Sequence, residues 1–201
     1  MKIQARDIDH LSLSVASPDA LAARLQQLGF NLTPDGAEPR CICFQPAEDD
    51  VPNYIEVVED EPGIAVAVNV TELQGGSLAH SWETEDGYQV DGEVVVGEVS
   101  GPLPWRPVRH ATPDAFMEPE WIVHPNGALA MMAVHAVAAN PREVAKALKE
   151  KWGAKVEEVL DGCMLVKTGT VELLIWSAAA YQSEYKPIEA MAPEDVTLAN
   201  H

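Results

Sequence analysis

Apolar residues recur along the chain in a rhythm that predicts strands followed by amphipathic helices. Residues 8–30 alternate like a strand and then take helical spacing from Pro18 to a closing glycine. Residues 132–154 repeat this order, with Asn140 in the N-cap position and Pro141 at the first helical position. The chain therefore contains at least two copies of a strand-helix unit.

Short runs rich in strand-forming residues follow each predicted helix. They span 41–44 and 53–59 after the first helix, and 163–167 and 170–176 after the second. Between the two units lies a weaker third copy. Its pattern predicts a strand over 63–70, a short helix over 73–82 that Gly75 and Gly76 disfavour, and strands over 93–100 and 105–110.

One helix followed by several short strands is typical of an α+β fold. The helices then lie on one face of a curved, mainly antiparallel sheet. We expect one domain over 1–177, built from repeated βαβββ modules at 6–60, 63–123 and 128–177. The Pro- and acid-rich residues 178–201 are expected to form an irregular tail.

Charge then excludes whole classes of partner. The 13 Lys and Arg against 32 Asp and Glu give a formal charge of −19, which disfavours nucleic acids and anionic membranes. The first residues carry charges and contain no apolar signal core, and the three cysteines are an odd number. We therefore expect a cytoplasmic protein with reduced thiols, without a membrane partner.

His10 and Glu56 are the first candidates for chemistry. Strand alternation separates His10 from Leu11 and Leu13, whose apolar side should pack on the helix. His10 then lies on the concave side of the curved sheet, where Tyr54 and Glu56 share a strand face. A single histidine in a strand is more often structural, but a glutamate inside a neighbouring apolar strand favours a site.

Four segments resemble the vicinal oxygen chelate superfamily of glyoxalases, extradiol dioxygenases and bleomycin-resistance proteins. They are IDHLSLSV, YIEVVE, GIAVAVNVTEL and, at 109–128, RHATPDAFMEPEWIVHPNGA. The last is similar to the glyoxalase-like domain subgroup. The resemblance covers residues 6–177 and implies paired modules that form a cup of sheet around a divalent metal.

The resemblance also implies the ligands. His10 and Glu56 match the superfamily's metal ligands in the first module, whereas the strand at 63–70 offers no ligand at the corresponding place. His110 lies where the second module's closing ligand would be. These three residues would make a two-histidine, one-carboxylate face for Fe, Mn, Zn, Ni or Co, with Glu56 and His110 also taking part in catalysis.

The last module offers a second choice of ligands, His135 and Glu172. Glu172 matches Glu56, but His135 lies two residues beyond the position that matches His10. A metal role for this pair competes with a vestigial role or a place in a dimer interface.

Other residues are candidates for substrate binding. Arg109, with Arg106, could bind an anionic group, and Trp105 and Tyr54 could line an apolar pocket. His124 could support the site from behind. Each has a structural alternative: a solvated or paired arginine, a core aromatic ring, and a histidine that fixes its loop by a hydrogen bond.

The sequence thus predicts a metal-dependent enzyme that acts on a small oxygenated metabolite as an isomerase, a lyase or a ring-cleaving dioxygenase. The alternatives are a non-catalytic protein that sequesters a toxin or antibiotic, and an interaction module. Because paired modules cover one another, the third should pack on the first two or pair with a second copy, and we expect a homodimer.

Overall fold

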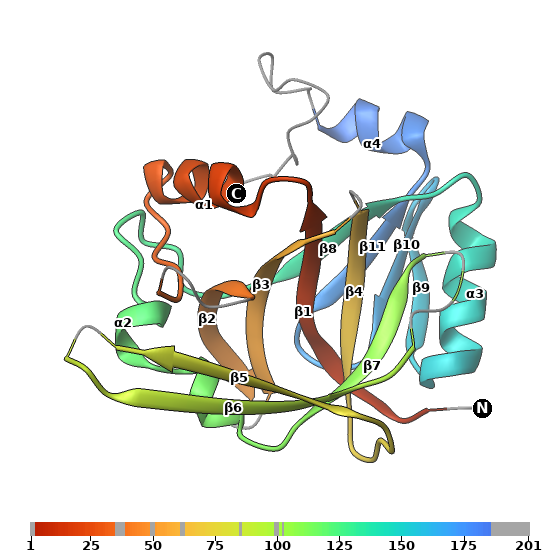
Figure 1. Cartoon of the computed structure of the whole chain (residues 1–201). Coiled ribbons are helices and arrows are strands. Elements are labelled where there is room, and N and C mark those ends of the chain that lie inside the picture. Colours follow the sequence, from red (N-terminus) through yellow and green to blue (C-terminus); the bar gives the residue numbers. More distant parts are fainter. Residues whose placement is uncertain are drawn as a thin grey trace.

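The computed structural model describes residues 3–34, 39–48, 51–60, 63–84, 86–98, 101 and 103–185. Figure 1 shows their helices and strands. The bounds are β1 Ala5–Val15, α1 Pro18–Gln27, β2 Arg40–Glu48, β3 Val51–Glu59, β4 Gly63–Val70, β5 Ser77–Glu83, β6 Gln89–Val96, β7 Trp105–His110, η1 Pro113–Phe116, α2 Pro119–Ile122, β8 Ala133–Val137, α3 Pro141–Trp152, β9 Lys155–Leu160, β10 Cys163–Lys167, β11 Glu172–Trp176 and α4 Ala178–Glu184. Among these residues we find no helix long and apolar enough to cross a membrane.

The first two modules share one curved, seven-stranded sheet in the order β2-β3-β1-β4-β7-β6-β5. Within each module the first and last strands are parallel neighbours, β1 with β3 and β4 with β7. The modules join where β1 and β4 pair antiparallel in the middle of the sheet. The predicted α+β fold with a curved, mainly antiparallel sheet is confirmed.

The second module lacks the helix that the sequence analysis expected over 73–82. Ser77–Glu83 instead forms β5, which pairs antiparallel with β6. Gly75 and Gly76 explain the difference, because two consecutive glycines disfavour a helix through their backbone entropy. In this module η1 and α2, which follow β7, contribute Phe116 and Trp121 to the apolar cluster of the sheet's inner face.

The third module has the complete order of one strand, one helix and three strands. Its four-stranded sheet runs β8-β11-β10-β9, again with the first and last strands parallel. The predicted caps of α3 are present: the Asn140 side chain accepts a hydrogen bond from the Glu143 N–H, and Gly153 ends the helix at φ 73°.

The expected irregular tail is partly wrong. Residues 178–184 form α4, because the Ser177 side chain caps the Ala180 N–H and three alanines follow it. The rest of the expected tail, 186–201, lies outside the described residues.

Each face of the large sheet is covered by its own apolar cluster. On the outer face, Ile8 and Leu13 pack with Leu25 of α1, and the same cluster continues into the third module through Leu148 and Leu173. The inner face is filled by a second cluster that includes Cys41, Cys43, Tyr54, Trp82, Val108, Phe116 and Trp121. The third module therefore packs within the chain, on the outer face.

Asp7, a fully buried residue of β1, attaches the third module to the first. Its Oδ1 accepts hydrogen bonds from the N–H of Ile8 at 2.8 Å and of Val171 at 3.0 Å, and its Oδ2 accepts one from Thr170 at 2.7 Å. Gly169 allows this approach, because a Cβ there would lie 2.5 Å from the Asp7 carboxyl carbon.

We predict that Asp7→Asn lowers the free energy of unfolding by on the order of 3 kcal/mol, because an amide nitrogen replaces an oxygen that buried N–H groups require. Chemical denaturation measures the effect. The control is Asp19→Asn on the exposed face of α1, where we expect a change of only a few tenths of a kcal/mol. Equal losses for both variants would contradict the role of Asp7.

The homodimer stays a prediction. β8 is an edge strand, and large apolar side chains are exposed at its last residue, Val137, and just before it, at Met132. We expect light scattering to give twice the mass of one chain, and Val137→Asp to give a monomer. Leu78→Asp, on the edge strand β5 of the other sheet, should leave the dimer intact. A wild-type monomer at high protein concentration would rule the dimer out.

Candidate functional site

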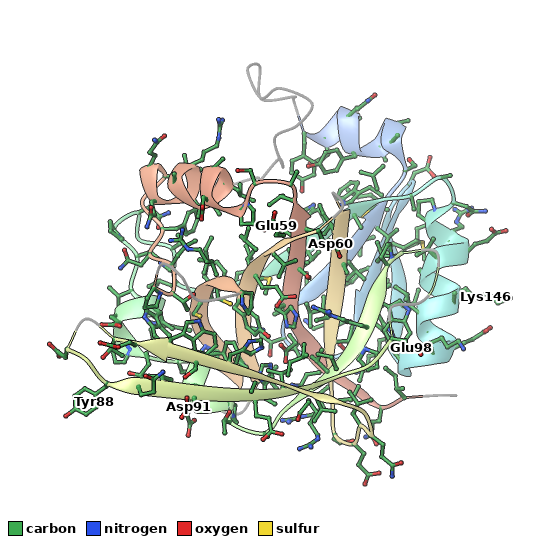
Figure 2. The ribbon with its side chains drawn as sticks, viewed as in Figure 1. Glu59, Asp60, Tyr88, Asp91, Glu98 and Lys146 are labelled. Atoms are coloured by element: carbon green, nitrogen blue, oxygen red, sulfur yellow. The ribbon has the colours of Figure 1, made fainter. Side chains whose placement is uncertain are left out.

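The candidate site contains two acidic residues that are buried. Glu59, Asp60 and Asp91, which are labelled in Figure 2, are exposed, so the solvent stabilises their charges. Asp9 and Glu56, by contrast, are buried at the inner face of the large sheet. Buried carboxylates need hydrogen bonds or opposite charges, so their partners define what this part of the protein can do.

Asp9 is placed by a bulge in β1. Ile8 pairs with Val68 and His10 with Ala67, so Asp9 is an extra residue between two pairs. The bulge lets Ile8 join the outer cluster while His10, only two positions later, points into the inner face.

The Asp9 carboxylate joins three side chains from three strands. Its Oδ1 accepts hydrogen bonds from His10 Nδ1 at 2.8 Å and from His110 Nε2 at 2.9 Å. Its Oδ2 accepts one from Asn69 Nδ2 at 2.8 Å. These contacts fix both imidazole rings and tie β7 to β1.

Glu56 lies on the other side of the His10 ring. Its Oε1 is 3.5 Å from His10 Nε2 and forms an ion pair with Nη2 of Arg106. In the described part of the chain, His10 Nε2 has no hydrogen-bond partner. A buried ring nitrogen that lies beside a carboxylate without a hydrogen bond of its own is available to a cation when the ring is neutral.

The charges of this group stabilise one another. Burial alone would raise the pKa of Asp9, but the charges and hydrogen bonds of His110 and His10 hold that pKa well below its usual value. Burial likewise opposes the shift at Glu56, where His10 and then Arg106 lower the pKa to about 2. The pKa of His10 is lowered by burial and raised more strongly by Glu56 and Asp9, so it ends above its usual value.

Aromatic rings fill the space around His10. The ring stacks on Tyr54 at 4.3 Å between centroids, and Tyr54 stacks on Phe116 at 4.6 Å. His110 meets the edge of Phe116 at 4.8 Å. Tyr54 therefore lies beside His10 as expected, but it is buried as part of the packing, and its role in substrate binding stays a prediction.

The predicted ligand triad is brought together only in pairs. His10 lies between Glu56 on its Nε2 side and Asp9 on its Nδ1 side, and His110 reaches Asp9. Among the described residues, the group whose ligand atoms lie within 4.8 Å of one another is Asp9, His10 and His110. The carboxylate that joins both histidines is thus Asp9. Regular alternation would place Asp9 and its neighbour His10 on opposite faces, but the bulge brings both to the inner face.

Two residues expected to contact the substrate, Trp105 and Arg109, belong to the face of the sheet opposite His10. Trp105 belongs to the outer cluster and meets the Trp152 ring of α3 at 5.4 Å. Arg109 has the same strand parity as Trp105, whereas Arg106 and His110 share the inner side. The arginine at the site is therefore Arg106.

His124 fixes its loop, which was the alternative to a role at the site. Its Nδ1 accepts a hydrogen bond from the Asn31 N–H at 3.1 Å, and its Nε2 donates to the Cys43 carbonyl at 2.9 Å. Its ring packs between Phe30 and Phe44. Burial lowers the pKa of His124, which fits a neutral ring with one hydrogen bond at each nitrogen.

The second-choice pair does not repeat the arrangement of the first module. Glu56 comes two residues after the residue opposite His10, whereas Glu172 comes two residues before Leu174, which lies opposite His135. His135 stacks on Trp176, and Glu172 pairs with Lys167 at 3.1 Å. His135 and Glu172 are therefore not placed relative to each other as His10 and Glu56 are.

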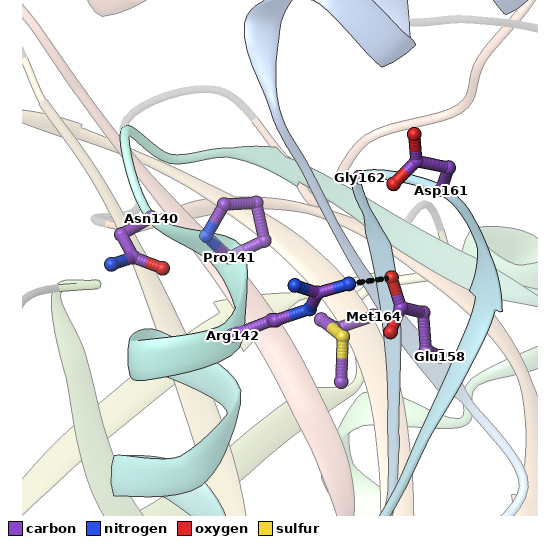
Figure 3. A pocket seen from close by; sticks show the side chains of 7 residues that line it. All are labelled: Asn140, Pro141, Arg142, Glu158, Asp161, Gly162 and Met164. Atoms are coloured by element: carbon purple, nitrogen blue, oxygen red, sulfur yellow. Dashed lines mark hydrogen bonds and ion pairs between the residues drawn. The ribbon is translucent and has the colours of Figure 1, made fainter.

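A surface hollow of about 160 Å³ lies elsewhere, between the start of α3 and the β9–β10 turn (Figure 3). It contains an ion pair between Arg142 and Glu158, 2.5 Å apart. Both partners are exposed, so water screens this pair and it adds little to stability.

Glu56 should make stability depend on pH. Its folded pKa of about 2 lies below its ordinary 4.5, so the unfolded chain takes up the proton first as the pH falls. The stability it contributes, on the order of 3 kcal/mol, is complete above pH ~4.5 and is lost towards pH ~2. Urea unfolding of Glu56→Gln should show a flatter pH dependence than wild type, whereas exposed Glu59→Gln on the same strand should not.

No protein-family model and no curated protein matches the sequence. Among solved structures, a hypothetical protein from Staphylococcus aureus is similar over 86% of both chains, at 8% identity and a TM-score of 0.56. A catechol 2,3-dioxygenase gives 9% identity and 0.48, and a halotolerant catechol dioxygenase gives 12% and 0.42. This chain spans 66% of each dioxygenase chain.

At these identities the likeness concerns the fold, and TM-scores below 0.5 for the two dioxygenases say nothing about activity. The module topology is nevertheless explicit in the strand pairing: a parallel first and last strand in each module, and antiparallel first strands where two modules meet. The subgroup suggested by residues 109–128 stays a prediction. The chain has a glyoxalase-like α+β fold.

Proposed function

We propose that this protein is a divalent-metal-dependent enzyme of the vicinal oxygen chelate type that acts on a small oxygenated metabolite. The observation that supports it is the state of His10. Its Nδ1 is held by the buried Asp9 carboxylate, and its buried Nε2 has no hydrogen-bond partner in the described chain and lies 3.5 Å from Glu56. A metal-ligating histidine is commonly oriented in this way, by a carboxylate on its second nitrogen.

His10 Nε2 and Glu56 would hold the metal. Imidazole nitrogen and carboxylate oxygen together suit Fe, Mn, Zn, Ni or Co. The metal would supply Lewis acidity towards two neighbouring oxygens of the substrate, the starting point of isomerase, lyase and ring-cleaving reactions alike. The protein's own contribution is to orient the His10 ring through Asp9 and to exclude water with the Tyr54 and Phe116 rings.

Asp9, His10 and His110 form a rival ligand set of two histidines and a carboxylate. Against it, Asp9 already accepts hydrogen bonds at both oxygens, and a metal bound there would have to replace some of them. The proposal therefore gives His110 the task of holding Asp9, and with it the ring of His10.

A second candidate function is a non-catalytic protein that sequesters a small molecule. The ion pair between Arg106 and Glu56 favours it, because the guanidinium already neutralises the carboxylate that would face a cation. In that case ligand affinity would be independent of metal. The three free thiols fit a reducing compartment such as the cytoplasm for either function.

Metal titration tests the proposal. Calorimetry of metal-free protein with Mn²⁺, Co²⁺, Ni²⁺ and Zn²⁺ should show one site in the wild type. We expect Glu56→Gln to abolish binding and Glu59→Gln to leave it unchanged. Asp9→Asn should weaken it by about 10- to 100-fold, the usual effect of a residue that orients a ligand.

The stability of each variant should be compared without metal, because a cation bound only to the folded state adds ~2.7 kcal/mol at a hundredfold excess over Kd. Binding that survives Glu56→Gln but is abolished by Asp9→Asn would move the metal to the rival ligand set. No binding by the wild type would leave the sequestering protein.

A further inference from the structure

Arg106 reaches the site from another module. Strand registers place four residues in one row across the sheet: Tyr54 on β3, His10 on β1, Ala67 on β4 and Arg106 on β7. Ala67 is fully buried and small, so it leaves the inner face open between Arg106 and the first module. Arg106 on β7 meets Glu56 on β3 across the inner face, although β4 and β1 lie between these two strands in the sheet.

The first strand of the second module has a glycine, not a metal ligand, at the position that matches His10. Gly63 precedes the alternating run 64–66 as His10 precedes 11–13, so Gly63 holds the position that matches His10. It pairs with Ser14, at the far end of the β1–β4 contact. Among its described residues, the second module thus brings the Arg106 guanidinium to the first module's glutamate, while its His110 is bonded to Asp9.

The Arg106 side chain is only partly buried. It is 21% exposed, against 8% for Glu56, and its buried Nε has no hydrogen-bond partner in the described residues. Within the described part of the chain, Arg106 forms its ion pair with the Glu56 oxygen that lies beside His10 Nε2. A divalent cation between His10 and Glu56 would meet the guanidinium at the same oxygen, and two cations repel one another strongly at such distances.

From this geometry we infer that Arg106 is a built-in competitor for the cation site and exchanges Glu56 for an anionic group of the bound molecule when a metal enters. The inference rests on the proposed function. The charges balance: the carboxylate loses a guanidinium and gains a divalent cation, and the released guanidinium takes a carboxylate oxygen. Arginine suits that role because its planar fork binds carboxylates with two parallel hydrogen bonds.

The ligand class follows from this exchange. A molecule with a carboxylate next to a second oxygen, such as a 2-oxo or 2-hydroxy acid, offers its oxygens to the metal and its negative charge to Arg106. In a protein with a formal charge of −19, such an anion needs a local positive group. Cation and anion should then bind cooperatively, each raising the affinity for the other by the same factor.

Mn²⁺ binding measured by electron paramagnetic resonance tests the competition. Without any anion, Arg106→Gln should bind Mn²⁺ more tightly than wild type by on the order of tenfold or more, because close charge pairs couple at least this strongly. Arg109→Gln removes the same charge from the opposite face of the same strand and should not change the affinity. Arg106→Lys, whose single ammonium replaces the fork, should fall between wild type and Arg106→Gln.

Arg106→Gln leaves the Glu56 carboxylate without its guanidinium, so thermal unfolding of the metal-free variant must first show that it folds. If it does not, the comparison of Arg106→Lys with wild type decides the question. Equal Mn²⁺ affinity of wild type and both Arg106 variants would overturn the competition while leaving the metalloenzyme proposal intact. Absence of Mn²⁺ binding in every variant would overturn both.

The exchange is tested by repeating the titration with sodium pyruvate against sodium chloride at equal ionic strength. Pyruvate should raise the Mn²⁺ affinity of wild type and Arg109→Gln several-fold, and should do so much less in Arg106→Gln. A pyruvate effect of the same size in all three proteins would come from the metal alone, and it would overturn the assigned role of Arg106 as the anion partner.

Discussion

Two buried carboxylates on β1 hold the molecule together. Asp7 accepts backbone hydrogen bonds from the third module, and Asp9 joins His10, His110 and Asn69 of the first two. Burying an ionised carboxylate is strongly unfavourable unless hydrogen bonds or opposite charges replace the lost water. The positions of β4, β7 and the β10–β11 turn are therefore constrained by the need to complete these two sets of contacts.

The same constraint gives the candidate site its geometry. Because Asp9 fixes one nitrogen of His10, the other can face only the Glu56 side of the ring. The aromatic rings of Tyr54 and Phe116 keep water from this place, and a poorly hydrated environment strengthens each electrostatic contact in it. A modest movement of Arg106 would then change the net charge around Glu56 by a full unit.

The three modules contribute unequally to this arrangement. The first supplies His10 and Glu56, and the second supplies Arg106 and His110 together with Phe116 over the inner face. The third is the most regular in its strand-helix order, yet it contributes packing on the outer face and the turn that binds Asp7. Regular architecture and site chemistry are thus divided between different copies of one repeated unit.

The sequence by itself determined the repeated modules, because Pro18, Pro141 and Gly153 mark helix ends and strand alternation is a local property. It also indicated His10 and Glu56 as candidates for a site, since strand alternation from His10 to Val15 and from Tyr54 to Val58 tells which residues share a face with each of them. Only the tertiary structure decided the rest. Asp9 reaches the inner face through a bulge that reverses the alternation, and the register of β7 on β4, a pairing of residues far apart in the chain, places Arg106 in the row of His10. Such choices depend on which backbone groups pair across strands, and no local pattern of apolar and polar residues records that.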